Sequence, residues 1–377
     1  MNQSGINKTA AFVSSRYVDL MLSTDFAMTR LGLNRKQMKQ DTTRSLLDVE
    51  AKAAEQKLKK QATEQEFKTY VSEFFHDKLF EYIEQRVADP EYIFAELLQY
   101  EPEIPKIFDA CAAKATGATQ LETLISSIPW LKAQFLSKIN KPPFREEKTT
   151  KPTVEEVILG VRYIGVENTK LLVLSEIAKK WLPHSTEPYS EYKRNYWKYT
   201  VATANCMRAL GPVYKLNDTV AYFFGLFHGI GISLMLRLYL RAFDTVRVAQ
   251  MKESNESGRK DIEKVLDALE VDTSFVSEAV NKYSWQMSVQ VFEKLGLKYA
   301  VVLPAAQEVL GGISYDEALP MTRAIMQAKT YAQYKILQQA RLIELDEAKA
   351  FLTHARINNT IISELNKVNL GRIRYLV

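Results

Sequence analysis

The sequence predicts an all-α fold, and two observations support this. Hydrophobic residues recur at helical spacing along the whole chain, and no run of alternating β-branched residues indicates a strand. The most apolar stretch, 218–240, places Phe223, Phe227 and Ile230 at that spacing after Asp218, a residue type favoured at helix N-caps. A helix that is apolar on nearly every side belongs in the centre of a protein, so we expect a multi-helix bundle packed around it.

The same stretch is almost long enough to span a membrane, which takes about 18 apolar residues or more. Gly225, Gly229 and Gly231 weaken it as a helix by up to about 1 kcal/mol each relative to alanine, and no other stretch approaches its hydrophobicity. A buried core helix is therefore favoured over a transmembrane one. Inside such a helix, the glycines at 229 and 231 indicate close helix approach or a local kink.

Composition indicates a soluble globular protein. The 377 residues are 46% hydrophobic and 25% charged, enough for two or three domains, and the net charge of +5 includes no lysine and arginine block typical of specific nucleic-acid binding. Cys111 and Cys206 have apolar neighbours and form no disulfide framework, as is usual in a reducing compartment. The opening residues lack a basic start followed by an apolar run. We therefore expect a cytoplasmic protein without a signal peptide that is not integral to a membrane.

The N-terminal part predicts two helices after weakly patterned residues 1–41. The first, 43–60, is charged and amphipathic, and we expect it to be solvated. The second, 65–86, carries an aromatic stripe and ends at Asp89-Pro90. We expect the stripe to form a surface for a partner or for self-association, or else a buttress on the core; its residues are Phe67, Tyr70, Phe74 and Phe75.

Short helices then follow in quick succession. Pro129 suits the first position of one, and Thr153 with Glu156 forms a capping-box pattern that opens another, ended before Gly165. The helices predicted before the central stretch cover about 92–99, 106–114, 121–126, 129–140, 153–164, 167–181 and 189–209, the last closed by Gly211. Those after it cover about 258–269, 274–282, 285–294, 299–310, 315–339, 346–355 and 358–368.

Several short motifs follow one another in a recognisable order: Ile104-Pro105-Lys106-Ile107, Ile128-Pro129-Trp130-Leu131 with Asn140, Tyr163-Ile164-Gly165, Trp197-Lys198-Tyr199-Thr200, Phe224 to Gly231, and Leu303-Pro304. In this order, from about residue 95 to 310, the chain resembles the HDOD family (HD-related output domains), signalling relatives of the HD-type metal-dependent phosphohydrolases. Ile128 departs from the family pattern, where aspartate is usual. The resemblance implies an HDOD-like core, which we expect over 93–310. The flanks carry no such resemblance, and we expect a helical N-terminal extension over 1–92 and C-terminal helices over 311–377 packed on the core.

The resemblance also implies where a metal site would lie. HD enzymes hold their metal with a histidine on an early helix, a His-Asp pair and a later aspartate, and the metal supplies hydroxide at neutral pH. Here these positions correspond to Tyr199, to His228-Gly229 and to a place near Ala328-Lys329, where a lysine would repel a cation. One imidazole does not hold a catalytic metal, since such sites use about three protein ligands. The resemblance thus implies the fold without the chemistry: no catalytic residue, no metal and no cofactor.

Two interpretations of His228 follow. It is either a former ligand or donor that lines a pocket, or a neutral core histidine bonded to a backbone carbonyl or to Tyr199, which we favour. Lys198, next to this degenerate site, is a candidate for attracting a phosphate. The aromatic and basic segment 192–198 fits stacking on a nucleotide or RNA, but its helical spacing favours core aromatics with a solvated basic face. The candidate pocket residues are Lys198, Tyr199, His228, Gly229 and Lys329.

The function that follows is binding. We expect a non-catalytic, bacterial signal-transduction or regulatory protein whose partner is another signalling protein or a small ligand, with self-association left open. The alternative is a divergent metal-dependent phosphohydrolase acting on nucleotide second messengers, with ligands recruited from residues such as Asp218, His184 or Glu191. The sequence has no phosphate-binding GxxxxGK[ST] loop, no CxxC, no HExxH and no GxSxG motif.

Overall fold

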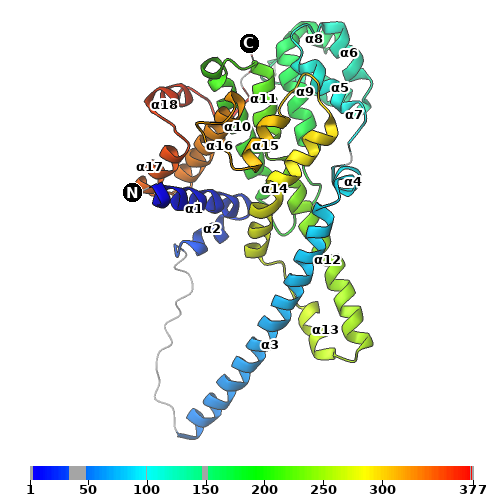
Figure 1. Cartoon of the computed structure of the whole chain (residues 1–377). Coiled ribbons are helices and arrows are strands. Elements are labelled where there is room, and N and C mark those ends of the chain that lie inside the picture. Colours follow the sequence, from blue (N-terminus) through cyan, green and yellow to red (C-terminus); the bar gives the residue numbers. More distant parts are fainter. Residues whose placement is uncertain (1–2, 34–47, 99, 147–151, 374, 376–377) are drawn as a thin grey trace.

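The computed structural model describes residues 3–33, 48–98, 100–146, 152–373 and 375, with only the backbone given for 48–62. Every secondary-structure element in these ranges is a helix, which confirms the all-α prediction. Most helices form one body, from which α3 (Asp48–Val87) projects as a long arm, with the end of α12 (Ile230–Glu256) and α13 (Lys260–Asp267) on the same side (Figure 1).

The N-terminal residues form more helix than their weak pattern predicted. Val13, Tyr17 and Met21 lie on one face of the first helix and are fully buried, so packing against the body compensates for a polar sequence. The two helices expected at 43–60 and 65–86 are one continuous helix, while 43–47 lie outside the described residues. The elements of this part besides α3 are α1 (Gln3–Leu22), α2 (Thr24–Arg30), α4 (Pro90–Tyr92) and the π-helix η1 (Ile93–Leu98).

The next group of helices contains one correction. The predicted capping box at Thr153 is not formed: the helix begins at Val157, and Glu156 at its N-cap makes no side-chain capping bond. Asn140 explains the later start, because its amide donates to the Val154 carbonyl (2.8 Å) and its oxygen accepts from the Val154 N–H (2.9 Å), holding that backbone outside the helix. The group comprises α5 (Ile104–Ala112), α6 (Ala118–Ser126), α7 (Pro129–Ile139), α8 (Val157–Ile164) and α9 (Val166–Lys180).

The central apolar stretch is two helices rather than one. α11 (Asp218–Phe227) and α12 are separated at His228 and Gly229, and α11 is capped by Asn217, whose oxygen accepts from the Thr219 and Val220 amides, rather than by Asp218. The preceding helix, α10 (Tyr192–Tyr214), continues past Gly211, its predicted end, until Lys215 adopts a left-handed conformation (φ 53°). The kink that the glycines indicated is therefore present.

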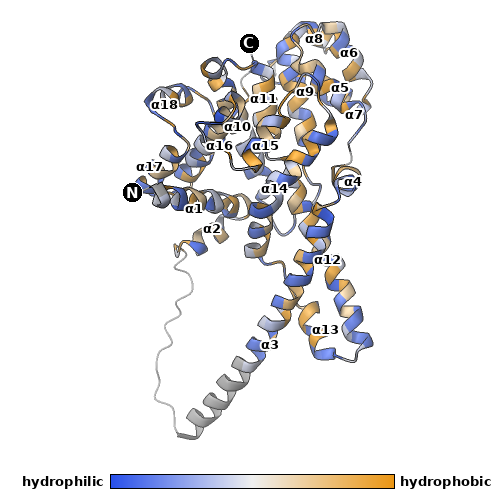
Figure 2. Ribbon diagram, viewed as in Figure 1, coloured by the Kyte–Doolittle hydropathy of each residue, from blue (hydrophilic) through white to orange (hydrophobic). Residues whose placement is uncertain are grey.

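This central stretch lies inside the protein. Within the described residues, Asp218–Glu256 is the one stretch long and apolar enough to cross a membrane, and 94% of its most apolar window is buried. Burial of this kind is typical of a core helix and fits the interpretation favoured by the sequence. Hydrophobic residues are frequent in α11 itself and in neighbouring helices of the body, such as α5 and α9 (Figure 2).

The last helices differ from prediction in where they begin. The helices expected at 274–282 and 285–294 are one helix, and Ser284 and Ser288 in the middle of it pack against Gly231. The helix expected from Tyr315 begins at Pro320, which lacks an N–H and suits a first helical position. These elements are α14 (Thr273–Leu295), α15 (Leu303–Leu310), α16 (Pro320–Gln339), α17 (Leu345–His354) and α18 (Asn359–Asn366).

α1, at the N-terminal end of the described chain, packs on α17 near the C-terminal end, and also on α10 and α14 (Figure 1). Arg16 of α1 holds this contact, because its guanidinium donates two hydrogen bonds of 2.7 Å to the Glu347 carboxylate and one of 2.7 Å to the Leu342 carbonyl. Buried residues of the three predicted segments belong to one hydrophobic cluster. The segment boundaries at 92 and 310 remain predictions.

The aromatic stripe of α3 is divided between core and surface. Phe75 is fully buried and meets the Phe243 ring edge-on at 5.0 Å between centroids, so this part of the helix is a buttress on α12. Phe67 is partly buried against the same core. Tyr70 and Phe74 are 63% and 50% exposed, and they remain the part of the stripe open to a partner.

Close backbone contact at Gly231 gives a test of the central packing. A β-carbon at this position would lie 1.8 Å from the Ser284 carbonyl oxygen, so Gly231→Ala is expected to destabilise the protein by about 3 kcal/mol or more, measured by denaturant unfolding. Gly229→Ala is the control, because the nearest atom to its β-carbon would be Ile232 Cδ1 at 3.5 Å, and a change within about 1 kcal/mol is expected. Equal stability of the two variants would contradict the close contact of α12 with α14.

Candidate functional site

The break between α11 and α12 places His228 at the centre of the body. Ser288 of α14 bridges the break, since its hydroxyl donates to the His228 carbonyl (2.9 Å) and accepts from the Gly231 N–H (2.9 Å). These are backbone groups of the kind left without a helical partner at helix ends. The bridge fixes the backbone on both sides of His228 and therefore the direction of its side chain.

His228 is buried, and both ring nitrogens are hydrogen-bonded. Nδ1 lies 2.8 Å from the Gly225 carbonyl oxygen, which can only accept, so Nδ1 carries the proton. Nε2 lies 2.9 Å from the Tyr199 hydroxyl and accepts its hydrogen bond. Burial lowers the pKa of His228 to about 3, and the nearby charge of Lys329 acts in the same direction. Both partners considered for a neutral core histidine are thus present, and the ring also lines a cavity, as the other interpretation of His228 expected.

Tyr199 of α10 completes this pair. Burial raises the pKa of its phenol well above the usual value, so the hydroxyl stays protonated and available as a donor, and Gln333 of α16 also hydrogen-bonds to it. The two rings meet nearly edge-on with 5.1 Å between centroids. The lone pair of His228 that a metal would need is thus used by a protein hydroxyl.

These residues do not fit a divalent metal. Tyr199 supplies a neutral phenol, Gly229 supplies no carboxylate, and Lys329 adds a positive charge where an acid would neutralise a metal. Among the residues that the structure describes, no three His, Cys, Asp or Glu side chains gather to form a metal-binding group. Tight catalytic sites need about three such ligands.

The residues considered as recruited ligands lie elsewhere. Asp218 begins α11, so about ten residues of helix, or about 15 Å, separate it from His228. Glu191 lies at the start of α10, where its carboxylate accepts from the Thr24 amide (3.0 Å). His184 lines a separate surface cavity before α10. These positions give no support to a reassembled metal site.

Lys329 brings a positive charge to the site. It projects from α16, and its Nζ lies 5.2 Å from the centroid of the Trp285 ring, within the range of a cation–π contact. None of the ion pairs among the described residues includes it. Burial lowers its pKa to about 8, so it remains mostly charged at neutral pH. The site thus holds a cation without a counter-ion.

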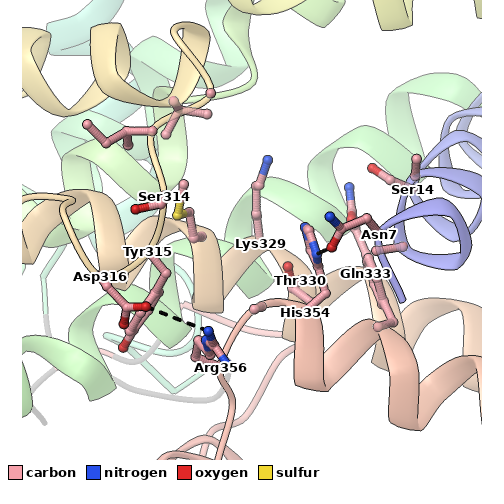
Figure 3. Close-up of a pocket in the computed structure, with 18 residues that line it drawn as sticks. Asn7, Ser14, Ser314, Tyr315, Asp316, Lys329, Thr330, Gln333, His354 and Arg356 are labelled. Atoms are coloured by element: carbon pink, nitrogen blue, oxygen red, sulfur yellow. Dashed lines mark hydrogen bonds and ion pairs between the residues drawn. The ribbon is translucent and has the colours of Figure 1, made fainter. Parts of the chain in front are cut away.

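Two cavities meet at this lysine. A smaller one of about 180 Å³ is lined by Tyr199, His228 and Gly229, and a larger one of about 550 Å³ opens beside it. Both are also lined by Ser14, Lys329 and Gln333. Figure 3 shows the larger cavity, with α1 contributing one wall and α16 another.

The structure brings together four of the five predicted pocket residues: Tyr199, His228, Gly229 and Lys329. It does not bring Lys198 there, because this side chain points to the neighbouring helix and donates to Gln339 Oε1 (2.7 Å). Sequence reasoning missed Gln333, although it lies four residues after Lys329 and therefore on the same helix face. It also missed Ser14, which no local pattern connects with this site.

An all-helical core with a histidine at the break between its two central helices is consistent with an HD-related domain. The chain belongs to the HDOD domain family, whose model matches residues 100–300. The match covers the region from α5 to α14, including His228, and lies within the region where the motifs showed the resemblance.

Two solved structures from Shewanella amazonensis SB2B are similar to the chain. One, described as a metal-dependent phosphohydrolase, is 14% identical, with 77% of this chain and 99% of that chain covered and a TM-score of 0.43. The other, described as a phosphohydrolase, is 15% identical, with 74% and 96% covered and a TM-score of 0.42. These values are too low to support an inference about activity. No curated protein matches the chain.

The neutral state of His228 predicts an acid sensitivity. Its lowered pKa means that, between about pH 6.5 and pH 3, the unfolded chain binds a proton that the folded chain does not, so stability falls as the pH falls. Relative to His228→Asn, which does not titrate, the wild-type protein is expected to lose up to about 1.4 kcal/mol per pH unit in this window. Denaturant unfolding of both proteins at several pH values measures the difference. Parallel curves would show that His228 has the same pKa in the folded and the unfolded protein.

Proposed function

We propose that this protein is a non-catalytic regulatory protein of bacterial signal transduction that acts in the cytoplasm by binding. The observation that carries the proposal is the 2.9 Å hydrogen bond from Tyr199 to His228, which uses the lone pair that HD enzymes give to a metal. Membership of the HDOD family supports the link with signalling.

The charge at the site supports the same proposal. A hydrolytic HD site concentrates metal charge among acids, whereas here Lys329 stands among neutral side chains. A positive charge of this kind disfavours metal loading. Among the described residues, the smaller cavity is also lined by no carboxylate that could act as a base on water. What remains is a cavity with a cation and hydrogen-bonding groups, which is suited to holding a small ligand.

The exposed part of the α3 stripe is proposed as a second binding surface, for another signalling protein or for a second copy of the chain. Tyr70 and Phe74 are large and exposed on an arm that projects from the body (Figure 1). Aromatic side chains are enriched among residues that dominate protein interfaces.

A double substitution tests this surface. Tyr70→Ser with Phe74→Ser leaves the buried face of α3 intact, and it is expected to reduce the self-association of the protein in sedimentation velocity at high concentration. Phe75→Ser, on the buried face, is expected instead to unfold α3 from the body. A wild-type protein that sediments as a monomer at every concentration would remove self-association from the proposal.

The metal content of protein purified without chelator tests the central claim. Plasma emission on the wild type and on His228→Ala is expected to find no stoichiometric Mn, Fe or Zn in either protein, and assays with phosphodiester substrates are expected to find no turnover. An HD enzyme with its ligands intact serves as the positive control for both measurements. Stoichiometric metal that is lost in His228→Ala, together with turnover, would contradict the proposal and favour the divergent phosphohydrolase.

A further inference from the structure

The larger cavity is built mainly by parts of the chain outside the family match. Its lining comes from α1, from the segment between α15 and α16, from α16, and from the residues that end α17 (Figure 3). All of these positions lie before residue 100 or after residue 300. The flanking helices therefore enclose a space next to the degenerate centre of the HDOD core.

The walls of this cavity are fixed to one another. The paired hydrogen bonds from Arg16 to Glu347 join α1 to α17, and the Glu347 carboxylate also accepts from the Glu344 amide in a capping box. At the mouth, His354 Nδ1 lies 3.1 Å from Asn7 Oδ1, so it donates between the same two elements. The cavity is thus preformed, as small-molecule sites usually are, and about 550 Å³ lies within their usual size.

The charges in the cavity are mostly positive. Lys329, His354 and Arg356 line it, and Asp316 is the one acidic side chain among the lining residues. Asp316 lies 3.6 Å from Arg356, so it compensates that charge only. Partial burial lowers the pKa of His354, and the charges of Lys329 and Arg356 lower it further, so this ring is neutral at neutral pH and Lys329 supplies the charge without a counter-ion in the described part of the chain.

Lys329 is partly buried, and its ammonium gains the face of the Trp285 ring but no counter-ion among the described residues for the hydration that it loses. The neutral groups around it are hydrogen-bonding side chains, namely Ser14, Thr330 and Gln333 (Figure 3). This arrangement is complementary to an anion that would accept from the ammonium and from the hydroxyl and amide donors together.

We propose that this cavity binds a small phosphorylated molecule, with its phosphate at Lys329 and its remaining part in the larger chamber towards His354 and Arg356. The inference rests on the proposed function, since it names the class of ligand that the binding protein takes. Lysine acts on phosphate as a point charge with three donors, and the hydroxyls of Ser14 and Thr330 and the amide of Gln333 offer further donors for the other phosphate oxygens. The bound molecule would contact α1, α16 and α17 at once.

Calorimetric titration with inorganic pyrophosphate tests the proposal on the full-length chain. The wild-type protein is expected to bind it with a Kd of about 1 mM or below, and Lys329→Met to bind it about tenfold or more weakly. Lys329→Arg, which keeps the charge, is expected to retain most of the affinity. Lys335→Met is the matched control, because Lys335 is on the same helix but lies over the Tyr331 and Tyr334 rings and lines neither cavity.

Thermal unfolding in chloride buffer serves as the control for the folding of the variants. Lys329→Met is expected to be at least as stable as the wild type there, since it removes a partly buried charge without a counter-ion, and pyrophosphate is expected to raise the Tm of the wild type but not of this variant. Equal affinity of wild type and Lys329→Met, or no heat of binding with pyrophosphate, would overturn the anion site. Neither result would introduce a metal or turnover, so failure of this inference is distinguishable from failure of the non-catalytic proposal.

Discussion

The contact of Gly231 with the backbone of α14 is the constraint on which the rest of the structure depends. Only a residue without a β-carbon lets α12 approach Ser284 this closely, and Ser288 then binds both sides of the α11–α12 break. A second glycine, Gly225, brings α11 close to α10, since a β-carbon there would lie 2.5 Å from the Ala204 Cα. These two contacts set His228 against Tyr199, so the geometry of the site follows from backbone packing.

Under the proposed non-catalytic function, the residues around His228 stabilise an HD-type centre that holds no metal. A buried histidine with an unused nitrogen would carry a desolvation cost, and the Tyr199 hydroxyl removes it. Gly229 takes away the carboxylate that would otherwise be buried without its metal. Lys329 reverses the electrostatic preference of the place from cations to anions. Each replacement is consistent with the others, since a neutral pair beside a cation has no tendency to recruit a divalent ion.

The flanking helices give the core a property that its family region lacks alone. Residues 100–300 supply His228 and Trp285, but the walls of the larger cavity come from α1, α16 and α17. The polar α1 is held by burial of Tyr17 and Met21 and by the Arg16–Glu347 pair, so the N-terminal and C-terminal segments are coupled through the same space. A ligand there would act on that coupling.

The sequence by itself determined the helical class, the family, the central position of 218–240, and the residue types Tyr199, Gly229 and Lys329 beside His228, because hydrophobic period and residue chemistry are local properties. Even the two partners of His228 followed from its surroundings. Tertiary structure alone decided where the central helix breaks, that Asn140 delays the start of α8, that Lys198 faces Gln339, and that Ser14 lies beside Lys329. These depend on contacts between residues far apart in the chain, which no spacing rule encodes.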